Sequence, residues 1–108
     1  MRWPIWRVAV AERSMEPALL PGDWLLAWRG LSRRRPPRIR PGQVVIARHP
    51  GNPALLLVKR AVRAQDGGWW LESDNTGVAA VDSRVFGQVP AGLIEARVLG
   101  RYWRGRSH

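Results

Sequence analysis

The stretch Ala54-Leu55-Leu56-Leu57-Val58-Lys59-Arg60-Ala61-Val62-Arg63 combines an apolar run with the only lysine of the chain. A short apolar run of this kind, bounded by Gly and Pro on the N-terminal side, predicts a β-strand. Side chains alternate between the two faces of a strand, so Lys59 would share a face with Leu55, Leu57 and Ala61. The sequence therefore predicts a lysine set among apolar neighbours.

The rest of the chain has the same pattern of short apolar runs separated by Pro and Gly, and none carries a useful helical stripe. Twice, at Pro21-Gly22 and Pro41-Gly42, a Pro-Gly turn leads into such a run. We predict strands over residues 5–10, 24–29, 43–48, 54–63, 69–72, 85–89 and 93–103. The expected fold is all-β, in a single domain that comprises residues 1–108.

The charge of the chain indicates which classes of partner it attracts, but it does not indicate a reaction. There are 18 basic and 8 acidic residues, which gives a net charge of +10. Such a surface attracts nucleic acid, anionic lipid or acidic polypeptide. Much of the charge lies in a Pro-rich loop at residues 31–40, including Arg33 and Arg38, and in a tail at residues 101–108. We interpret the loop as solvated, with a docking patch for an acidic partner as the alternative.

Other residue types exclude several classes of site. Cysteine is absent and there are two histidines, His49 and His108, so a thiolate metal site, a cysteine nucleophile and a histidine metal cage are not expected. We expect no cofactor. The N-terminus lacks an apolar run of about 18 residues, which argues against a membrane span or a signal peptide. The expected location is cytoplasmic, with peripheral contact to an anionic membrane left open.

Lys59 is a candidate general base because an amine can lose its proton in a protein, whereas a guanidinium effectively cannot. Burial disfavours the charged amine. Lowering its pKa from about 10.4 to about 7 or 8 would require roughly 3 to 5 kcal/mol. The alternative is a lysine that extends from the end of a strand into water, and the residues alone leave both open.

Ser14 is the best placed of the five serines to act as a nucleophile. It follows a predicted strand and precedes a turn bent by Pro17, where a hydroxyl can project while backbone amides converge on an oxyanion. A Ser-x-x-Pro sequence is also common in turns and caps. His49 is a weaker candidate base because a Pro- and Gly-containing loop follows it, and we interpret it as a surface histidine.

Four segments in order resemble the signal peptidase I (S26) family of serine–lysine proteases. They are Ser14–Leu19 with Pro21-Gly22-Asp23, Arg40–Val45, Val58-Lys59-Arg60, and Ser73-Asp74-Asn75 with Val81–Val89. The resemblance implies a small, coiled and partly open β-barrel-like domain with Ser14 as nucleophile and Lys59 as general base.

The resemblance also implies supporting residues. The backbone N–H of Ser14 would contribute to the oxyanion hole, with Met15 beside it. Asp82 and Arg84 would buttress the site. Two further residues, Ser83 and Asn75, have alternative roles. Ser83 would either orient Lys59 or act as an ordinary turn hydroxyl, and Asn75 would bond the turn backbone or face the substrate.

Departures from the family pattern bear on the substrate. The usual membrane-spanning N-terminus is not seen, Gln43 stands where aspartate is customary, and Ser73 and Thr76 replace glycine and arginine. Compact chains of this kind are similar to the proteases that trim the N-terminal extension of nickel-containing superoxide dismutase. If the substrate is such a precursor, nickel is bound by the mature superoxide dismutase and not by this enzyme.

The favoured function is therefore a serine endopeptidase that removes an N-terminal propeptide from a precursor polypeptide bound as an extended strand. The first alternative is cleavage of secretory signal peptides at the membrane surface. The second is a non-enzymatic basic β-domain that binds nucleic acid, supported by arginines interleaved with aromatic residues.

Overall fold

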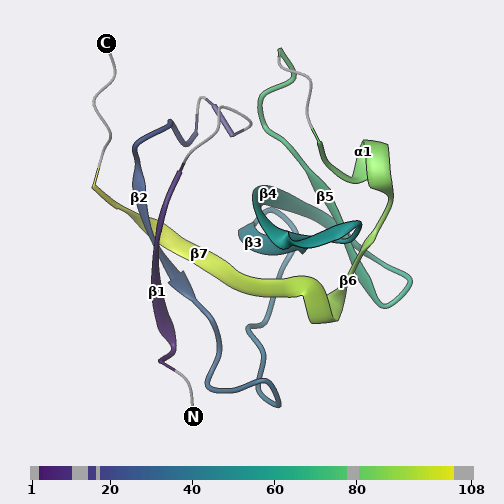
Figure 1. Cartoon of the computed structure of the whole chain (residues 1–108), viewed down its shortest axis with the longest axis horizontal. Helices are drawn as coiled ribbons and strands as arrows, with labels where there is room; N and C mark the ends of the chain where they lie inside the picture. Colours follow the sequence, from purple (N-terminus) through teal and green to yellow (C-terminus); the bar gives the residue numbers. More distant parts are fainter. Residues whose placement is uncertain (1–2, 11–14, 17, 78–80, 104–108) are drawn as a thin grey trace.

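The computed structural model describes residues 3–10, 15–16, 18–77 and 81–103, and its regular elements are almost all strands (Figure 1). The strands are β1 (Ile5–Ala9), β2 (Trp24–Trp28), β3 (Val44–His49), β4 (Asn52–Gln65), β5 (Gly68–Glu72), β6 (Val89–Pro90) and β7 (Ile94–Trp103). A short helix, α1 (Ser83–Phe86), and a 3₁₀ turn at Ala91–Leu93 complete the set. The mostly β class predicted from the sequence is confirmed.

The seven strands form one antiparallel sheet in the order β1-β2-β7-β3-β4-β5-β6. The long strand β7 crosses the middle of the molecule and joins its two halves (Figure 1). Its first residues pair with β3, and its later residues, from Arg97 to Trp103, pair with β2. The sheet therefore bends around β7, and β4 and β5 lie in the half away from β1.

One predicted strand is wrong. The segment expected to be a strand at residues 85–89 begins as part of α1 and continues to the two-residue strand β6. The side chain of Asp82 accepts a hydrogen bond from the backbone N–H of Arg84 and so caps the helix, an arrangement that favours a helical turn. Gly87, with φ of 82°, ends it.

The hairpin of β4 and β5 turns tightly and contains a bulge. Its turn residues Asp66 and Gly67 both have positive φ, of 49° and 80°, as two-residue hairpin turns require. Further along, Ala61 lies opposite Leu71, but Arg63 lies opposite Trp70. The residue between them on β4 is thus one extra residue without a partner, which shifts the register of the hairpin by one position.

Both faces of β3 are buried. Val45 and Ala47 belong to a cluster on one face with Ala61, Leu71, Val89 and Ile94. Ile46 belongs to a cluster on the other face with Ala27 and Ala96. Burying each of the larger side chains contributes about 1.5–3 kcal/mol. The first of these faces is the one that carries Lys59.

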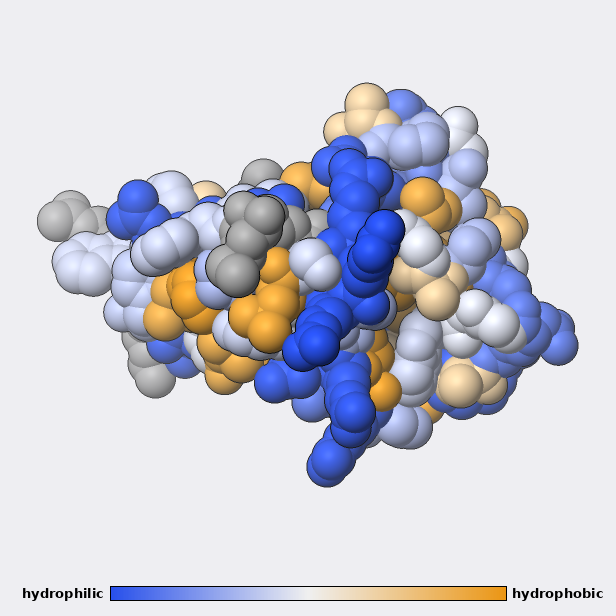
Figure 2. All heavy atoms as spheres, turned by 90° about the horizontal axis from the view of Figure 1, so that it is seen from below, coloured by the Kyte–Doolittle hydropathy of each residue, from blue (hydrophilic) through white to orange (hydrophobic). Residues whose placement is uncertain are grey.

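The connection between β2 and β3 carries the exposed arginines Arg33, Arg34, Arg35 and Arg38. Seen from below, a band of strongly hydrophilic residues crosses the molecule between more hydrophobic areas (Figure 2). The predicted basic tail lies outside the described residues beyond Trp103. Among the described residues, no helix has the length and hydrophobicity needed to cross a membrane.

Candidate active site

Lys59 is buried on β4. Its side chain is 2% exposed and lies on the same face as Leu57 and Ala61, both also buried, as the alternation of the strand predicts. Across the ladder its partner is Val45. The Nζ atom donates a hydrogen bond of 3.0 Å to Oγ of Ser73. The lysine therefore does not extend into water, which excludes the snorkelling alternative.

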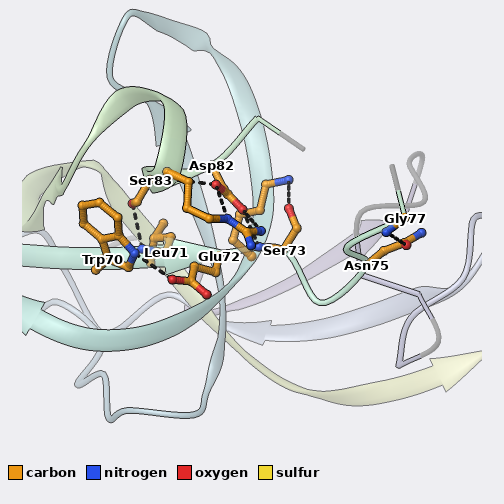
Figure 3. A network of polar contacts seen from close by, with 10 residues as sticks. Trp70, Leu71, Glu72, Ser73, Asn75, Gly77, Asp82 and Ser83 are labelled. Carbon is orange, nitrogen blue, oxygen red and sulfur yellow. Dashed lines mark hydrogen bonds and ion pairs between the residues drawn. The ribbon is translucent and has the colours of Figure 1, made fainter. Parts of the chain in front are cut away.

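Ser73 directly follows β5 and is 5% exposed. Its backbone N–H donates to Oδ2 of Asp82 at 2.8 Å (Figure 3). The serine is thus held from its backbone while its hydroxyl contacts Lys59. In the sequence, Ser73 belongs to a segment that resembles the family but stands where glycine is usual, and no sequence signal indicates its contact with Lys59.

Asp82 is fully buried and connects Ser73 to Arg84. It accepts hydrogen bonds from Ser73, from the backbone N–H of Arg84 at 3.0 Å and from Nη2 of Arg84 at 2.7 Å. Burial acts to raise the pKa of Asp82, but the hydrogen bonds from Arg84 and Ser73 outweigh it and hold this pKa below its ordinary value. Asp82 is therefore an ionised anchor for Ser73 and Arg84, and its role in buttressing a catalytic site stays a prediction.

Ser83 does not orient Lys59. Its hydroxyl accepts a hydrogen bond of 2.8 Å from the backbone N–H of Leu71 (Figure 3). Ser83 is the first residue of α1, and the helical turn directs its side chain onto β5. Of the two roles open for Ser83, the structure therefore supports the structural one, and the hydroxyl that contacts Lys59 is that of Ser73.

The chain after Ser73 is held by side chains as well. Oδ1 of Asn75 accepts from the backbone N–H of Gly77 at 2.9 Å, which closes a local turn. Asp74 pairs with Arg60, whose Nη2 lies 2.5 Å from its Oδ2. The hydrogen bond to Asp74 raises the pKa of the Arg60 guanidinium above its usual value. The segment is thereby tied to β4. A substrate-facing role for Asn75 stays a prediction.

The structure describes Met15, the residue after the predicted nucleophile. Ser14 itself lies outside the described residues, so its distance from Lys59 stays a prediction. Met15 is 1% exposed and belongs to a buried cluster with Val10, Leu19 and Leu25. Val58, the residue before Lys59, packs against this cluster. The residue after Ser14 and the residue before Lys59 therefore share one packing unit.

A surface cavity lies away from these residues. Its volume is about 650 Å³, and it is lined by Arg29, Arg33, Pro36, Arg48, Ala91, Gly92, Leu93, Ile94 and Glu95. Lys59, Ser73 and Asp82 are not among these residues. Within the described ranges, no group of three or more His, Asp or Glu side chains could hold a metal ion. The candidate site is therefore identified by the buried amine of Lys59 and its hydrogen bond, and not by a cavity.

Residues 6–92 match the family model described as Peptidase S24-like, which includes Lys59, Ser73 and Asp82. The chain belongs to the peptidase S24-like family. The more specific resemblance to signal peptidase I stays a prediction.

Curated relatives of this S24-like chain are named as proteases. It is 35% identical to the mitochondrial ATP-independent inner membrane protease subunit 1a of Arabidopsis thaliana, over 83% of the chain and 66% of the relative. It is 31% identical to the human mitochondrial inner membrane protease subunit 1, over 83% of the chain and 64% of the relative. It is 32% identical to the mitochondrial inner membrane protease subunit 2 of Schizosaccharomyces pombe, over 83% of the chain and 60% of the relative. The chain spans slightly less than two thirds of the length of these relatives.

Proposed function

We propose that this S24-like protein is a serine endopeptidase in which Ser14 is the nucleophile and Lys59 the general base. The observation that carries the proposal is the buried amine of Lys59, hydrogen-bonded at 3.0 Å to a neutral hydroxyl. Burial disfavours the ammonium form, and a base must be uncharged to accept a proton. Ser14 is close to Lys59 in the fold only to the extent that Met15, the residue after it, and Val58, the residue before Lys59, pack in one cluster.

The proposed reaction is amide hydrolysis through an acyl-enzyme. Neutral Lys59 takes the hydroxyl proton of Ser14 as the oxygen attacks the scissile carbonyl, and the backbone N–H of Ser14 stabilises the oxyanion. The lysine then gives its proton to the leaving amine as the C–N bond breaks. Water, deprotonated by the same amine, attacks the acyl carbonyl, and the lysine returns this proton to the Ser14 oxygen as the acyl C–O bond breaks and the second product leaves.

The strand that carries Lys59 also offers an edge for an extended substrate. On one side of β4, Asn52 and residues 56–60 pair with β3, whereas pairing with β5 on the other side begins only at Arg60. Among the described strands, none pairs with residues 52–59 on that second side. A polypeptide lying there would gain main-chain hydrogen bonds that lead it to the amine.

We infer that the substrate is a precursor polypeptide from which an N-terminal propeptide is removed. The resemblance of the sequence to nickel superoxide dismutase maturation proteases favours such a precursor, in the cytoplasm. The curated relatives, by contrast, are named inner membrane proteases. Together with the exposed arginines of the β2–β3 connection, these names favour a second substrate, a signal peptide cleaved at an anionic membrane surface.

The test combines variants with mass spectrometry of candidate precursors. Ser14→Ala and Lys59→Met should each abolish cleavage, and Arg63→Met, at an exposed basic residue of the same strand, should not. One defined cut in a nickel superoxide dismutase precursor would support the first substrate. A cut in a secretory precursor that requires anionic vesicles would support the second. Undiminished cleavage by Lys59→Met would contradict the proposed mechanism.

A further inference from the structure

We propose that the surface cavity between the β2–β3 connection and the start of β7 binds a phosphomonoester, either a free small molecule or the headgroup of a lipid. The β2–β3 connection and the 3₁₀ turn before β7 lie toward the lower side of the molecule in Figure 1. Among the described residues, the lining contains three arginines, Arg29, Arg33 and Arg48, and one carboxylate, that of Glu95. Positive charges in the lining therefore exceed negative charges by two.

Arg48 is held in place before any ligand arrives. Its Nε donates to Oε1 of Glu95 at 2.5 Å, and its Nη1 donates to the backbone carbonyl of Pro53 at 2.8 Å. These contacts engage only part of the guanidinium, which carries further N–H donors. A cation that is already oriented loses little conformational freedom when an anion binds to it.

Arg29 is fixed from β1. Its backbone N–H donates to the carbonyl of Pro4 at 2.8 Å. The guanidinium carbon lies 5.0 Å from the centroid of the Trp6 ring, within the range of a cation–π contact. The second cation of the cavity wall is thus positioned by two contacts with the N-terminal strand and the residue before it.

A tight turn presents Arg33 to the cavity. The backbone N–H of Arg35 donates to the carbonyl of Ser32 at 3.0 Å, so Arg33 and Arg34 occupy the central positions of a β-turn. The connection folds back closely at Gly30, where a Cβ atom would lie 2.3 Å from the carbonyl oxygen of Arg35. Of the two central arginines, Arg33 lines the cavity and Arg34 does not.

The charge and size of the cavity favour a phosphomonoester over a carboxylate. A phosphomonoester carries a charge of about −1.5 to −2 at neutral pH and three strong acceptor oxygens, which suits an excess of two positive charges. Guanidinium groups pair with such oxygens through two parallel hydrogen bonds. The volume of about 650 Å³ leaves room for more than a phosphate group, and Pro36, Leu93 and Ile94 offer apolar contacts to the rest of the ligand.

This site is separate from the proposed cleavage reaction. Val45 lies directly opposite Lys59 and therefore shares its face of the sheet. Arg48, three residues further along β3 in unbroken register, lies on the other face. A ligand in the cavity would not contact the amine, so Lys59→Met should bind phosphate as the unmodified protein does.

The test is isothermal titration calorimetry with inorganic phosphate as the probe, at constant ionic strength. One phosphate should bind per chain. Arg33→Met should weaken this binding about 10- to 100-fold, the loss expected for a hydrogen bond between charged groups. Because Arg33 is exposed, its replacement leaves the core intact. Arg48→Met should weaken binding to a similar extent.

Arg34→Met is the matched control, because Arg34 is an exposed arginine of the same turn that does not line the cavity. It removes the same charge from the surface, so it should change the affinity for phosphate less than about twofold. Equal weakening by Arg33→Met and Arg34→Met would indicate diffuse attraction by the basic surface and would overturn the site.

Vesicles distinguish the two sources of the phosphate group. Phosphatidic acid carries a phosphomonoester, whereas phosphatidylglycerol carries a diester. Stronger co-sedimentation with phosphatidic acid vesicles than with phosphatidylglycerol vesicles of equal surface charge, abolished by Arg33→Met, would identify a lipid headgroup. Equal co-sedimentation, together with binding of inorganic phosphate in solution, would identify a free small phosphomonoester.

Two further outcomes would contradict the proposal. The first is the absence of binding to inorganic phosphate and of any preference for phosphatidic acid. The second is tighter binding of a glutamate-rich peptide than of phosphate, with the same loss in Arg33→Met, which would assign the cavity to polypeptide carboxylates. Neither outcome bears on cleavage, which is tested by Ser14→Ala and Lys59→Met.

Discussion

The carboxylate of Asp23 and the guanidinium of Arg101 meet at 3.1 Å, although 78 residues separate them in the chain. Asp23 is 1% exposed and also accepts from the backbone N–H of Leu20 at 2.9 Å. Nη1 of Arg101 reaches the carbonyl of Ala18 at 3.4 Å as well. Strand β7 thus holds the turn that follows Met15.

This contact predicts energetic coupling between the two residues. A double-mutant cycle of Asp23→Asn and Arg101→Met should give a coupling free energy of about 1 kcal/mol in chemical denaturation, because one partner is buried. The more exposed pair Arg48 and Glu95 should give less. Arg101→Met should also slow cleavage, since the turn after Met15 loses its tether. Coupling near zero for Asp23 and Arg101 would contradict the tether.

Asp82 should make the fold sensitive to acid. Because its pKa in the folded protein is below the ordinary value of 3.8, it contributes stability above that pH, and this stability is lost as the pH falls below it. The melting temperature of Asp82→Asn should therefore change less between pH 5 and pH 2.5 than that of the unmodified protein. At neutral pH the variant should be less stable by roughly 1–3 kcal/mol.

The control for this experiment is Asp66→Asn, at an exposed turn position whose φ of 49° asparagine also tolerates. It should keep the acid sensitivity of the unmodified protein. Equal loss of stability in acid by Asp82→Asn would show that another group is responsible.

Gly68 should not accept a larger side chain. A Cβ atom there would overlap the backbone carbonyl oxygen of Val89, which lies on the paired strand β6. Gly68→Ala should therefore lower the melting temperature by several degrees, as overpacking costs about 1–3 kcal/mol. Gly92→Ala is the comparison, because no atom lies within 4 Å of its Cβ position. It should be neutral or slightly stabilising, and an equal loss in both variants would contradict the steric argument.

Lys59→Arg separates charge from basicity. The variant keeps a cation at a buried position but cannot release a proton near neutral pH, so cleavage should be abolished. Circular dichroism should show whether the larger guanidinium is accommodated on β4, and Lys59→Met covers the case in which it is not. Cleavage by the unmodified protein should rise with pH through one deprotonation. A profile flat up to pH 10 would contradict an amine base.

The sequence predicts the strands well because alternation and Pro-Gly turns are local signals. It also predicts the face of β4 on which Lys59 lies. It fails at residues 85–89, where a cap from Asp82 starts a helical turn within an apolar run that resembles a strand. It misses Ser73 for another reason. The residue that lies opposite Lys59 depends on the register of the hairpin, and no residue pattern in the sequence predicts the bulge between Ala61 and Arg63.

That bulge has a chemical consequence. In the register set by the turn at Asp66 and Gly67, an unbroken ladder would bring Asp74, and not Ser73, opposite Lys59. A lysine facing a carboxylate would form a permanent ion pair and remain a cation. The surplus residue Val62 thus exchanges an acid for an alcohol beside the amine. Deleting the whole residue Val62 would therefore replace the contact between amine and hydroxyl with a salt bridge between Lys59 and Asp74.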